Sequence, residues 1–158
     1  MKFFRTADDE PRLKELKGLS LFKELSLREL RELDELLHER TYHKDEVIFD
    51  EGDVGLGLFI VVSGRVRVVS SHVALQQLAP QFGPGEFFGE LGLFDEAPRT
   101  ARAVAMEPTR ALALLRTEMV ALLERNHRVA GKILFELSRT VCRRSRKLAL
   151  SEQHSPVL

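Results

Sequence analysis

FGELGLF at residues 88–94, followed shortly by PRTA at residues 98–101, is the most informative stretch of this sequence. Gly89 and Gly92 flank a single helical turn that begins near Glu90, and the backbone N–H groups at the start of such a turn attract anions. Arg99 adds a planar fork of donors that can bind the same anion. The stretch therefore predicts an anion site built from one short turn and one arginine.

Glu90 is the unusual member of this predicted site, because a carboxylate repels a phosphate. Its position is understandable if the ligand also carries hydroxyl donors close to its phosphate, as a ribose does. Glu90 would then accept a hydroxyl while Arg99 donates to the phosphate. The alternative is that Glu90 and Arg99 form a structural ion pair in a fold that does not bind a ligand.

The segments around this stretch, from about Thr41 to Leu115, have the character of β-strands. Short apolar runs alternate with turn residues, and the Ser63-Gly64 pair between two of them predicts a tight hairpin. Many short strands without intervening helices favour an antiparallel roll or sandwich over a parallel sheet. The predicted strands are Glu46–Phe49, Leu58–Val62, Arg65–Val69, Ala74–Leu78, Arg102–Met106 and Thr109–Leu115.

Both ends of the chain read as helical. Up to about Arg40, leucines recur at three- and four-residue spacings, and Ser26 with Glu29 forms a capping-box pattern before them. Between about Thr117 and Leu150, we expect Thr117 to cap a short helix and Asn126 to separate it from a longer one. The leucines of the first region are Leu27, Leu30, Leu33, Leu36 and Leu37; the apolar stripe of the last helix is Val129, Ile133, Leu137, Val141 and Leu148.

Composition narrows the classes of function. The 158 residues suit a single domain spanning 1–158, with an N-terminal helix and β-rich part at about 18–115 and helices at 117–150. Lys plus Arg (24) equal Asp plus Glu (24), so no basic excess indicates a nucleic-acid partner. We interpret the basic cluster of the last helix as a solvated helix end. It comprises Arg139, Arg143, Arg144, Arg146 and Lys147.

The sequence also lacks several patterns that would indicate other locations or chemistry. Cys142 is a single cysteine, and no apolar run approaches the ~20 residues of a membrane span, so we expect a cytoplasmic protein. The five histidines lack metal-ligand spacing, and no phosphate loop or dinucleotide fingerprint is present. We therefore expect neither a metal, nor a cofactor, nor an enzyme.

Taken together with its flanks, the stretch resembles the phosphate-binding cassette of the cyclic nucleotide-binding domain family. This family includes catabolite-activator-type bacterial regulators, protein-kinase regulatory subunits and gated channels. Asp50–Asp53, Leu58–Val66 and Gly83–Phe87 match family positions in family order, so the resemblance covers residues 18 to 148.

The resemblance implies a mainly β fold, an antiparallel eight-stranded β-roll (jelly-roll-like) with N-terminal helices and a C-terminal helix pair. It also implies that Glu90 accepts the ribose 2′-hydroxyl and that Arg99 pairs with the cyclic phosphate of cAMP or cGMP. The remaining ligand-binding residues it implies are Gly89, Leu91, Gly92, Thr100 and Ala101.

Two positions and one stretch bear on how closely the chain follows the family pattern. Threonine at position 100 occurs in cGMP-selective members, where its hydroxyl can reach the guanine amino group, and also in cAMP-binding relatives. It therefore favours cGMP slightly and does not decide the base. Asp45 replaces the usual turn glycine, which Asp tolerates. The stretch 70–81 fits the family hairpin poorly, and since the family lines the purine side of the pocket partly from there, base preference stays open.

The predicted function is a sensor that binds cAMP or cGMP and signals by moving its C-terminal helix. The family pattern adds an effector protein that is unknown and a homodimer through that helix, with Val129, Ile133, Leu137 and Val141 as its seam. The alternative for this stripe is that it only covers the β-roll. Eight residues follow Leu150, too few for a DNA-binding domain in this chain. The alternatives are a binding-inactive roll used for dimerisation or docking, and the sensor fragment of a larger regulator.

Overall fold

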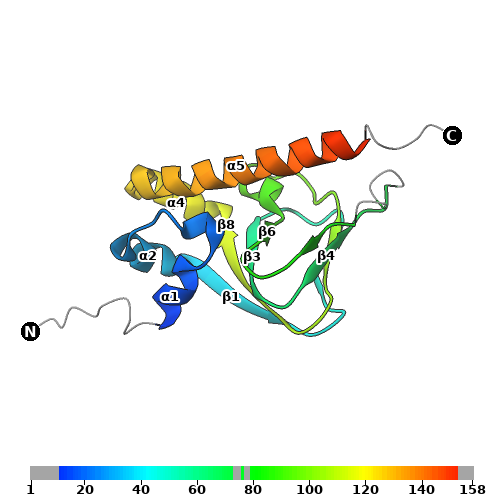
Figure 1. Ribbon diagram of the computed structural model, residues 1–158, viewed down its shortest axis with the longest axis horizontal. Coiled ribbons are helices and arrows are strands. Elements are labelled where there is room, and N and C mark those ends of the chain that lie inside the picture. The colour runs from blue at the N-terminus through cyan, green and yellow to red at the C-terminus, as the bar shows by residue number, and fades with distance from the viewer. Residues whose placement is uncertain (1–10, 73–75, 77–78, 153–158) are drawn as a thin grey trace, which may run out of the picture.

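The computed structural model describes residues 11–72, 76 and 79–152. Its helices lie at both ends of the chain, with one short helical turn between strands (Figure 1). They are α1 (Pro11–Lys17), η2 (Ser20–Phe22), α2 (Leu27–Asp34), η3 (Glu90–Leu93), α4 (Arg116–Arg125) and α5 (His127–Glu152).

The strands form two antiparallel sheets of four strands each, in the orders β1-β8-β3-β6 and β2-β7-β4-β5. The predicted eight-stranded antiparallel β-roll is therefore confirmed. The strands are β1 (Leu37–Tyr42), β2 (Val47–Phe49), β3 (Gly57–Ser63), β4 (Val66–Val69), β5 (Gln81–Phe82), β6 (Phe87–Phe88), β7 (Arg102–Ala105) and β8 (Thr109–Leu115). Of the strand predicted at 74–78, only Gln76 is described, and it is helical instead of extended, with its N–H donating to the His72 carbonyl at 3.0 Å; the rest lies outside the described residues.

The N-terminal helical region is shorter than its leucine spacing predicts. The capping box is confirmed: the Ser26 hydroxyl accepts from the Glu29 backbone at 3.3 Å, and the Ser26 backbone donates to the Glu29 carboxylate at 2.8 Å. However, α2 ends at Asp34, and residues 37–42 form β1 instead of helix. They pair with β8 along their whole length, from Leu37 opposite Leu114 to Tyr42 opposite Thr109. Inter-strand hydrogen bonds thus outweigh a weak local helix preference.

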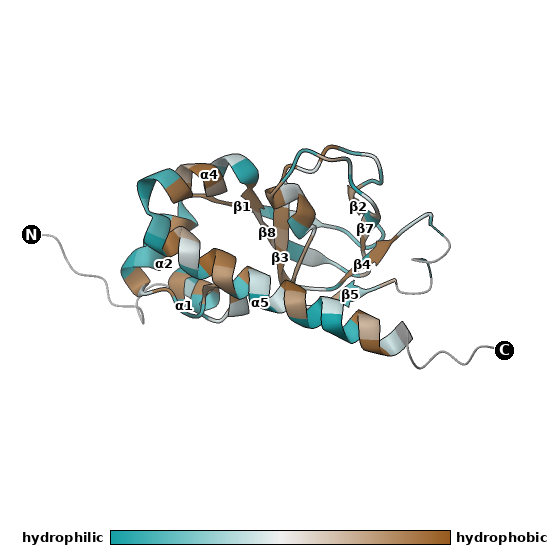
Figure 2. Cartoon of the chain, turned by 90° about the horizontal axis from the view of Figure 1, so that it is seen from above, coloured by the Kyte–Doolittle hydropathy of each residue, from teal (hydrophilic) through white to brown (hydrophobic). Residues whose placement is uncertain are grey.

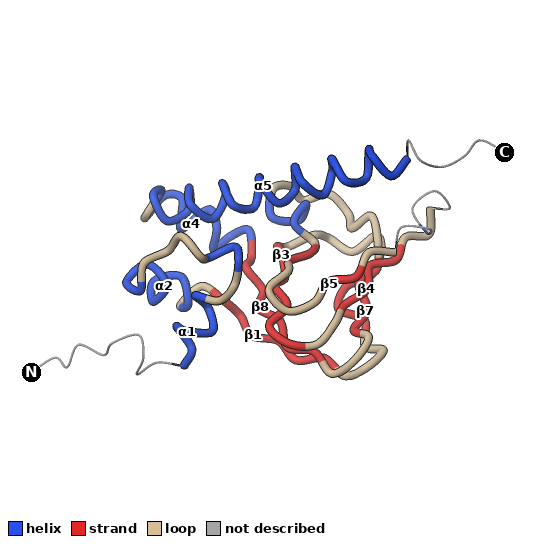
Figure 3. Tube along the Cα trace, in the orientation of Figure 1, coloured by secondary structure: helices blue, strands red, loops and turns tan. Residues whose placement is uncertain are grey.

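The two C-terminal helices occur as predicted, but the start of α4 differs. Asn126 separates α4 from α5. Thr117 does not cap α4, because Leu115 occupies the N-cap position, and the Thr117 hydroxyl donates to the Glu118 carboxylate within the first turn. Figure 3 shows α1, α2 and α4 gathered at one end of the molecule, the strands at the other, and α5 running along both.

The main core lies where the helices meet the first sheet. Apolar side chains of α1, α2, α4, α5, β3 and β8 form one buried cluster. Val129, Ile133 and Leu137 belong to it and are at most 2% exposed. Val141 packs against the same cluster. The stripe predicted as a dimer seam therefore covers the protein's own core, and that assignment is wrong. Figure 2 shows apolar and hydrophilic residues alternating along α5, as a helix with one buried face requires.

Candidate functional site

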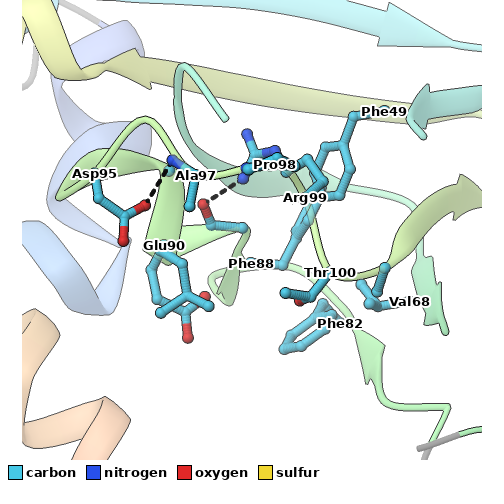
Figure 4. Close-up of a pocket in the computed structure, with 14 residues that line it drawn as sticks. Phe49, Val68, Phe82, Phe88, Glu90, Asp95, Ala97, Pro98, Arg99 and Thr100 are labelled. Atoms are coloured by element: carbon cyan, nitrogen blue, oxygen red, sulfur yellow. Dashed lines mark hydrogen bonds between the residues drawn. The ribbon is translucent and has the colours of Figure 1, made fainter. Parts of the chain in front are cut away.

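A cavity of about 410 Å³ opens between η3, the segment 95–101 and the second sheet. Figure 4 shows the labelled side chains around it, with Arg99 and Phe49 near one another and Phe82 and Val68 beyond Thr100. Every residue predicted for the ligand site lines this cavity. The full lining is Phe49, Val68, Phe82, Phe88, Gly89, Glu90, Leu91, Gly92, Asp95, Ala97, Pro98, Arg99, Thr100 and Ala101.

Arg99 is held on both its backbone and its side chain. Its N–H donates to Asp53 at 2.7 Å, and its carbonyl accepts from Gly52 at 2.8 Å. The guanidinium donates to the carbonyls of Gly89 (Nη1, 2.7 Å) and Gly57 (Nη2, 2.8 Å). These bonds orient the guanidinium rigidly before any ligand arrives.

The Arg99 guanidinium still has unused donors. Two of its N–H groups serve the carbonyls above, and its buried Nε finds no hydrogen-bond partner among the described residues. The face of the Phe49 ring lies 4.1 Å from the guanidinium carbon. Burial lowers the pKa of Arg99, while the carboxylates of Glu90 and Asp53 act to raise it. A partly buried cation whose Nε donor is buried and partnerless, next to a cavity, has the chemistry of an anion site.

Gly89 and Gly92 provide the space in which this arginine lies. A Cβ atom at either position would come within 2.9 Å of Arg99 Nη1. Gly89 also has φ of 73°, in the left-handed region that favours glycine. The glycines therefore do more than shape the turn, because they let the arginine approach the backbone.

Glu90 begins η3, and its side chain is 21% exposed. It forms an ion pair with Arg144 of α5, whose Nη1 lies 3.7 Å from Glu90 Oε1. The structural ion pair with Arg99 that we considered from the sequence is thus replaced by contacts of Arg99 with carbonyl groups. Glu90 and Arg99 both line the cavity, so that one ligand could contact both side chains.

Sequence reasoning missed the aromatic wall of the cavity. Phe88 stacks with Phe59 and Phe82 at ring-centroid distances of 5.5 and 5.7 Å, and Phe49 lies 5.9 Å from Phe88. These residues come from β2, β3, β5 and β6, which belong to both sheets. Their apolar runs predict strands, but only the closure of the roll brings these rings together.

The sequence predicted that Arg144 belongs to a solvated basic helix end, but in the structure it packs against Phe82 and Phe87. Its side chain is 28% exposed and its Nη2 donates to the carbonyl of Phe87 at 2.7 Å. Its guanidinium carbon lies 4.3 and 4.9 Å from the ring centroids of Phe87 and Phe82. Arg143 and Arg146, by contrast, are exposed.

Comparison with known proteins finds the same domain. The sequence model of the cyclic nucleotide-binding domain matches residues 39–126. The cyclic AMP receptor protein of Thermus thermophilus is 39% identical over 125 residues, which are 78% of this chain and 58% of that protein. A CRP-like cAMP-activated global transcriptional regulator of Mycobacterium tuberculosis is 28% identical, over 74% of this chain and 53% of that protein.

A solved structure supports the same fold. The crystal structure of a cyclic nucleotide-binding domain from Methylobacillus flagellatus superposes with a TM-score of 0.79 and 26% identity, covering 93% of this chain and 84% of that one. The chain spans little more than half the length of the two curated relatives above.

No helix in residues 11–72, 76 and 79–152 is long and apolar enough to cross a membrane. The same residues contain no group of His, Cys, Asp and Glu side chains arranged to hold a metal ion.

Proposed function

Because the chain belongs to the cyclic nucleotide-binding domain family, we propose that its cavity binds cAMP or cGMP. The observation that carries the proposal is Arg99, a partly buried cation whose buried Nε has no hydrogen-bond partner among the described residues. The volume of about 410 Å³ falls within the range of about 300–1,000 Å³ that is usual for small-molecule sites.

In the proposed complex, the cyclic phosphate lies against Arg99 and the backbone of the 89–92 turn. The ribose 2′-hydroxyl donates to Glu90. The base extends toward Phe82 and Val68, past Thr100, because these side chains form the apolar part of the lining. Gly89, Leu91, Gly92 and Ala101 complete the site through backbone and van der Waals contacts.

We further propose that binding, rather than turnover, is the output of this site. A ligand that contacts η3 more favourably when α5 is close would shift the population toward that arrangement, and an effector protein would respond to it. The chain would act as one sensing domain in the cytoplasm.

We also propose a homodimer through α5. It would use a different face of the helix from the one that the sequence predicted. Phe135 is 65% exposed, and it begins a solvent-facing series at alternating three- and four-residue spacings. Such spacing lets two helices pair along one face, and small side chains allow close approach. The series is Phe135, Ser138, Cys142, Ser145 and Ala149.

Calorimetric titration with cAMP, cGMP and cyclic di-GMP tests the proposed ligand. We expect cAMP or cGMP to bind, and Arg99→Ala and Glu90→Ala each to weaken binding by at least about 1–2 kcal/mol, because each removes a charge-assisted hydrogen bond.

Arg102→Ala is the matched control. Arg102 lies three residues after Arg99, but it is half-exposed and pairs with Asp50 instead of lining the cavity. Its loss should leave affinity unchanged. Absence of both heat and thermal shift with every cyclic nucleotide would favour the alternative function, a binding-inactive roll used for docking.

A further inference from the structure

Arg144 is the α5 residue that joins this helix to the wall of the cavity. Its guanidinium lies against the rings of Phe82 and Phe87 and donates to the Phe87 carbonyl at 2.7 Å. Phe82 lines the cavity, and Phe87 precedes the cavity residue Phe88. Figure 1 shows α5 passing over β6 at this point. Arg144, a partly buried cation, therefore attaches the C-terminal half of α5 to the cavity wall.

The same guanidinium faces Glu90. Arg144 Nη1 lies 3.7 Å from Glu90 Oε1, and both side chains are less than one-third exposed, at 28% and 21%. Burial lowers the pKa of Arg144, while the carboxylates of Glu90 and Glu86 oppose that effect. Pairing at this degree of burial is screened less than at the surface, so it restricts where the Glu90 carboxylate points.

We infer that Arg144 is a positioning residue for Glu90, and that it couples the docking of α5 to recognition of the ligand's sugar hydroxyl. The inference rests on the proposed function. Arg144 holds Oε1 of Glu90 and leaves Oε2 for the 2′-hydroxyl. Since coupling is reciprocal, a ligand that engages Glu90 favours the docked position of Arg144, and docked Arg144 favours that ligand.

The coupling is measurable by pairing a protein variant with a ligand variant. Arg144→Met keeps an apolar stem between the two rings and removes the charge, and 2′-deoxy-cAMP lacks the hydroxyl (2′-deoxy-cGMP if cGMP is the tighter ligand). We expect R144M to weaken binding of the parent nucleotide about tenfold and binding of the 2′-deoxy analogue by less than about twofold. A purely structural contribution of Arg144 would affect both ligands alike.

Arg143→Met is the control, because it changes a neighbouring exposed arginine of the same helix. It should leave both affinities unchanged. Arg144→Gln provides a second variant if R144M does not fold, with the same expected difference between the two ligands.

The outcomes separate the two proposals. Equal losses for both ligands, or no loss for either, would overturn the positioning of Glu90 by Arg144 while leaving nucleotide binding intact. Failure of the unmodified protein to bind either parent nucleotide would instead overturn the proposed function, and the coupling with it.

Discussion

At the scale of single residues, the site depends on how closely backbone and side chain approach one another around Arg99. The guanidinium lies within van der Waals reach of the backbone at Gly89 and Gly92, so that a single added methyl group at either would collide with it. The orientation of the guanidinium thus depends on the absence of a Cβ atom at Gly89 and Gly92, and on the carbonyls to which it donates.

Gly89→Ala tests this steric requirement. A Cβ at position 89 would lie 2.9 Å from Arg99 Nη1 and 3.2 Å from the Phe49 ring, and alanine also disfavours φ of 73°. We expect a stability loss of about 1–2 kcal/mol from the backbone alone, and weaker nucleotide binding in addition. Chemical denaturation and calorimetry measure the two effects.

Gly85→Ala separates the backbone effect from the collision. Gly85 has a similar φ of 85°, but no described atom lies within 4 Å of its added Cβ. It should lose similar backbone stability and keep its affinity for the nucleotide. Comparable weakening of binding in both variants would show that the collision with Arg99 is unimportant.

At the scale of elements, the proposed signal depends on the position of α5 relative to the cavity. The first turn of this helix depends on one side chain, that of Asn126. Asn126 Oδ1 accepts from the Val129 backbone at 3.3 Å and so caps the first turn of α5. Its Nδ2 donates to Glu32 of α2 at 2.9 Å. A single residue therefore both begins α5 and ties it to the N-terminal helices.

Asn126→Ala should destabilise the protein by about 1–2 kcal/mol, since it removes the cap and the contact with Glu32. Asn126→Ser retains a capping oxygen but cannot donate to Glu32 in the same way, so it should recover part of the loss. Denaturation midpoints give both values. Equal losses in the two variants would mean that the cap contributes nothing.

At the scale of the whole molecule, ion pairs connect segments that are distant in sequence. Lys132 of α5 bonds Glu29 of α2 at 2.8 Å. Burial of Glu29 acts to raise its pKa, but hydrogen bonds from Lys132 and Ser26 outweigh burial and hold the pKa below its ordinary value of 4.5. The hydrogen bond from Arg110 lowers the pKa of Glu39 as well.

These lowered pKa values predict loss of stability in acid. Below about pH 4.5 the unfolded chain binds more protons than the folded chain, so the free energy of unfolding should fall as the pH drops toward the folded-state pKa values. Urea denaturation between pH 7 and pH 3 measures this. Lys132→Met should make the decline shallower, and a stability that rises on acidification would contradict the prediction.

The proposed homodimer gives a second prediction at this scale. In a parallel pair of α5 helices joined through the exposed series, the two copies of Cys142 would face each other. Cys142 is free and exposed in the single chain. Mild oxidation should then yield a covalent dimer on a non-reducing gel. Phe135→Ser should reduce its yield and Cys142→Ser should abolish it, whereas a monomer in light scattering would contradict this pairing.

Much of the fold follows from local sequence. Short β-rich runs between turn residues predicted β2, β3, β4, β7 and β8, and the Ser26–Glu29 pattern predicted the start of α2. The glycines and Arg99 of residues 88–101 also stand close enough in sequence for one local segment to bring the predicted site residues to a single cavity.

Only the tertiary structure decided the features that depend on distant partners. Residues 37–42 are a strand because β8 is available to pair with them. Phe49 faces Arg99 because the roll closes, and Arg144 reaches Glu90 because α5 crosses the cavity wall. Val129, Ile133 and Leu137 of α5 are buried because the core beneath them is the protein's own, whereas Leu148 of the same predicted stripe is exposed. Local preferences are worth tenths of a kcal/mol per residue, and such long-range contacts readily override them.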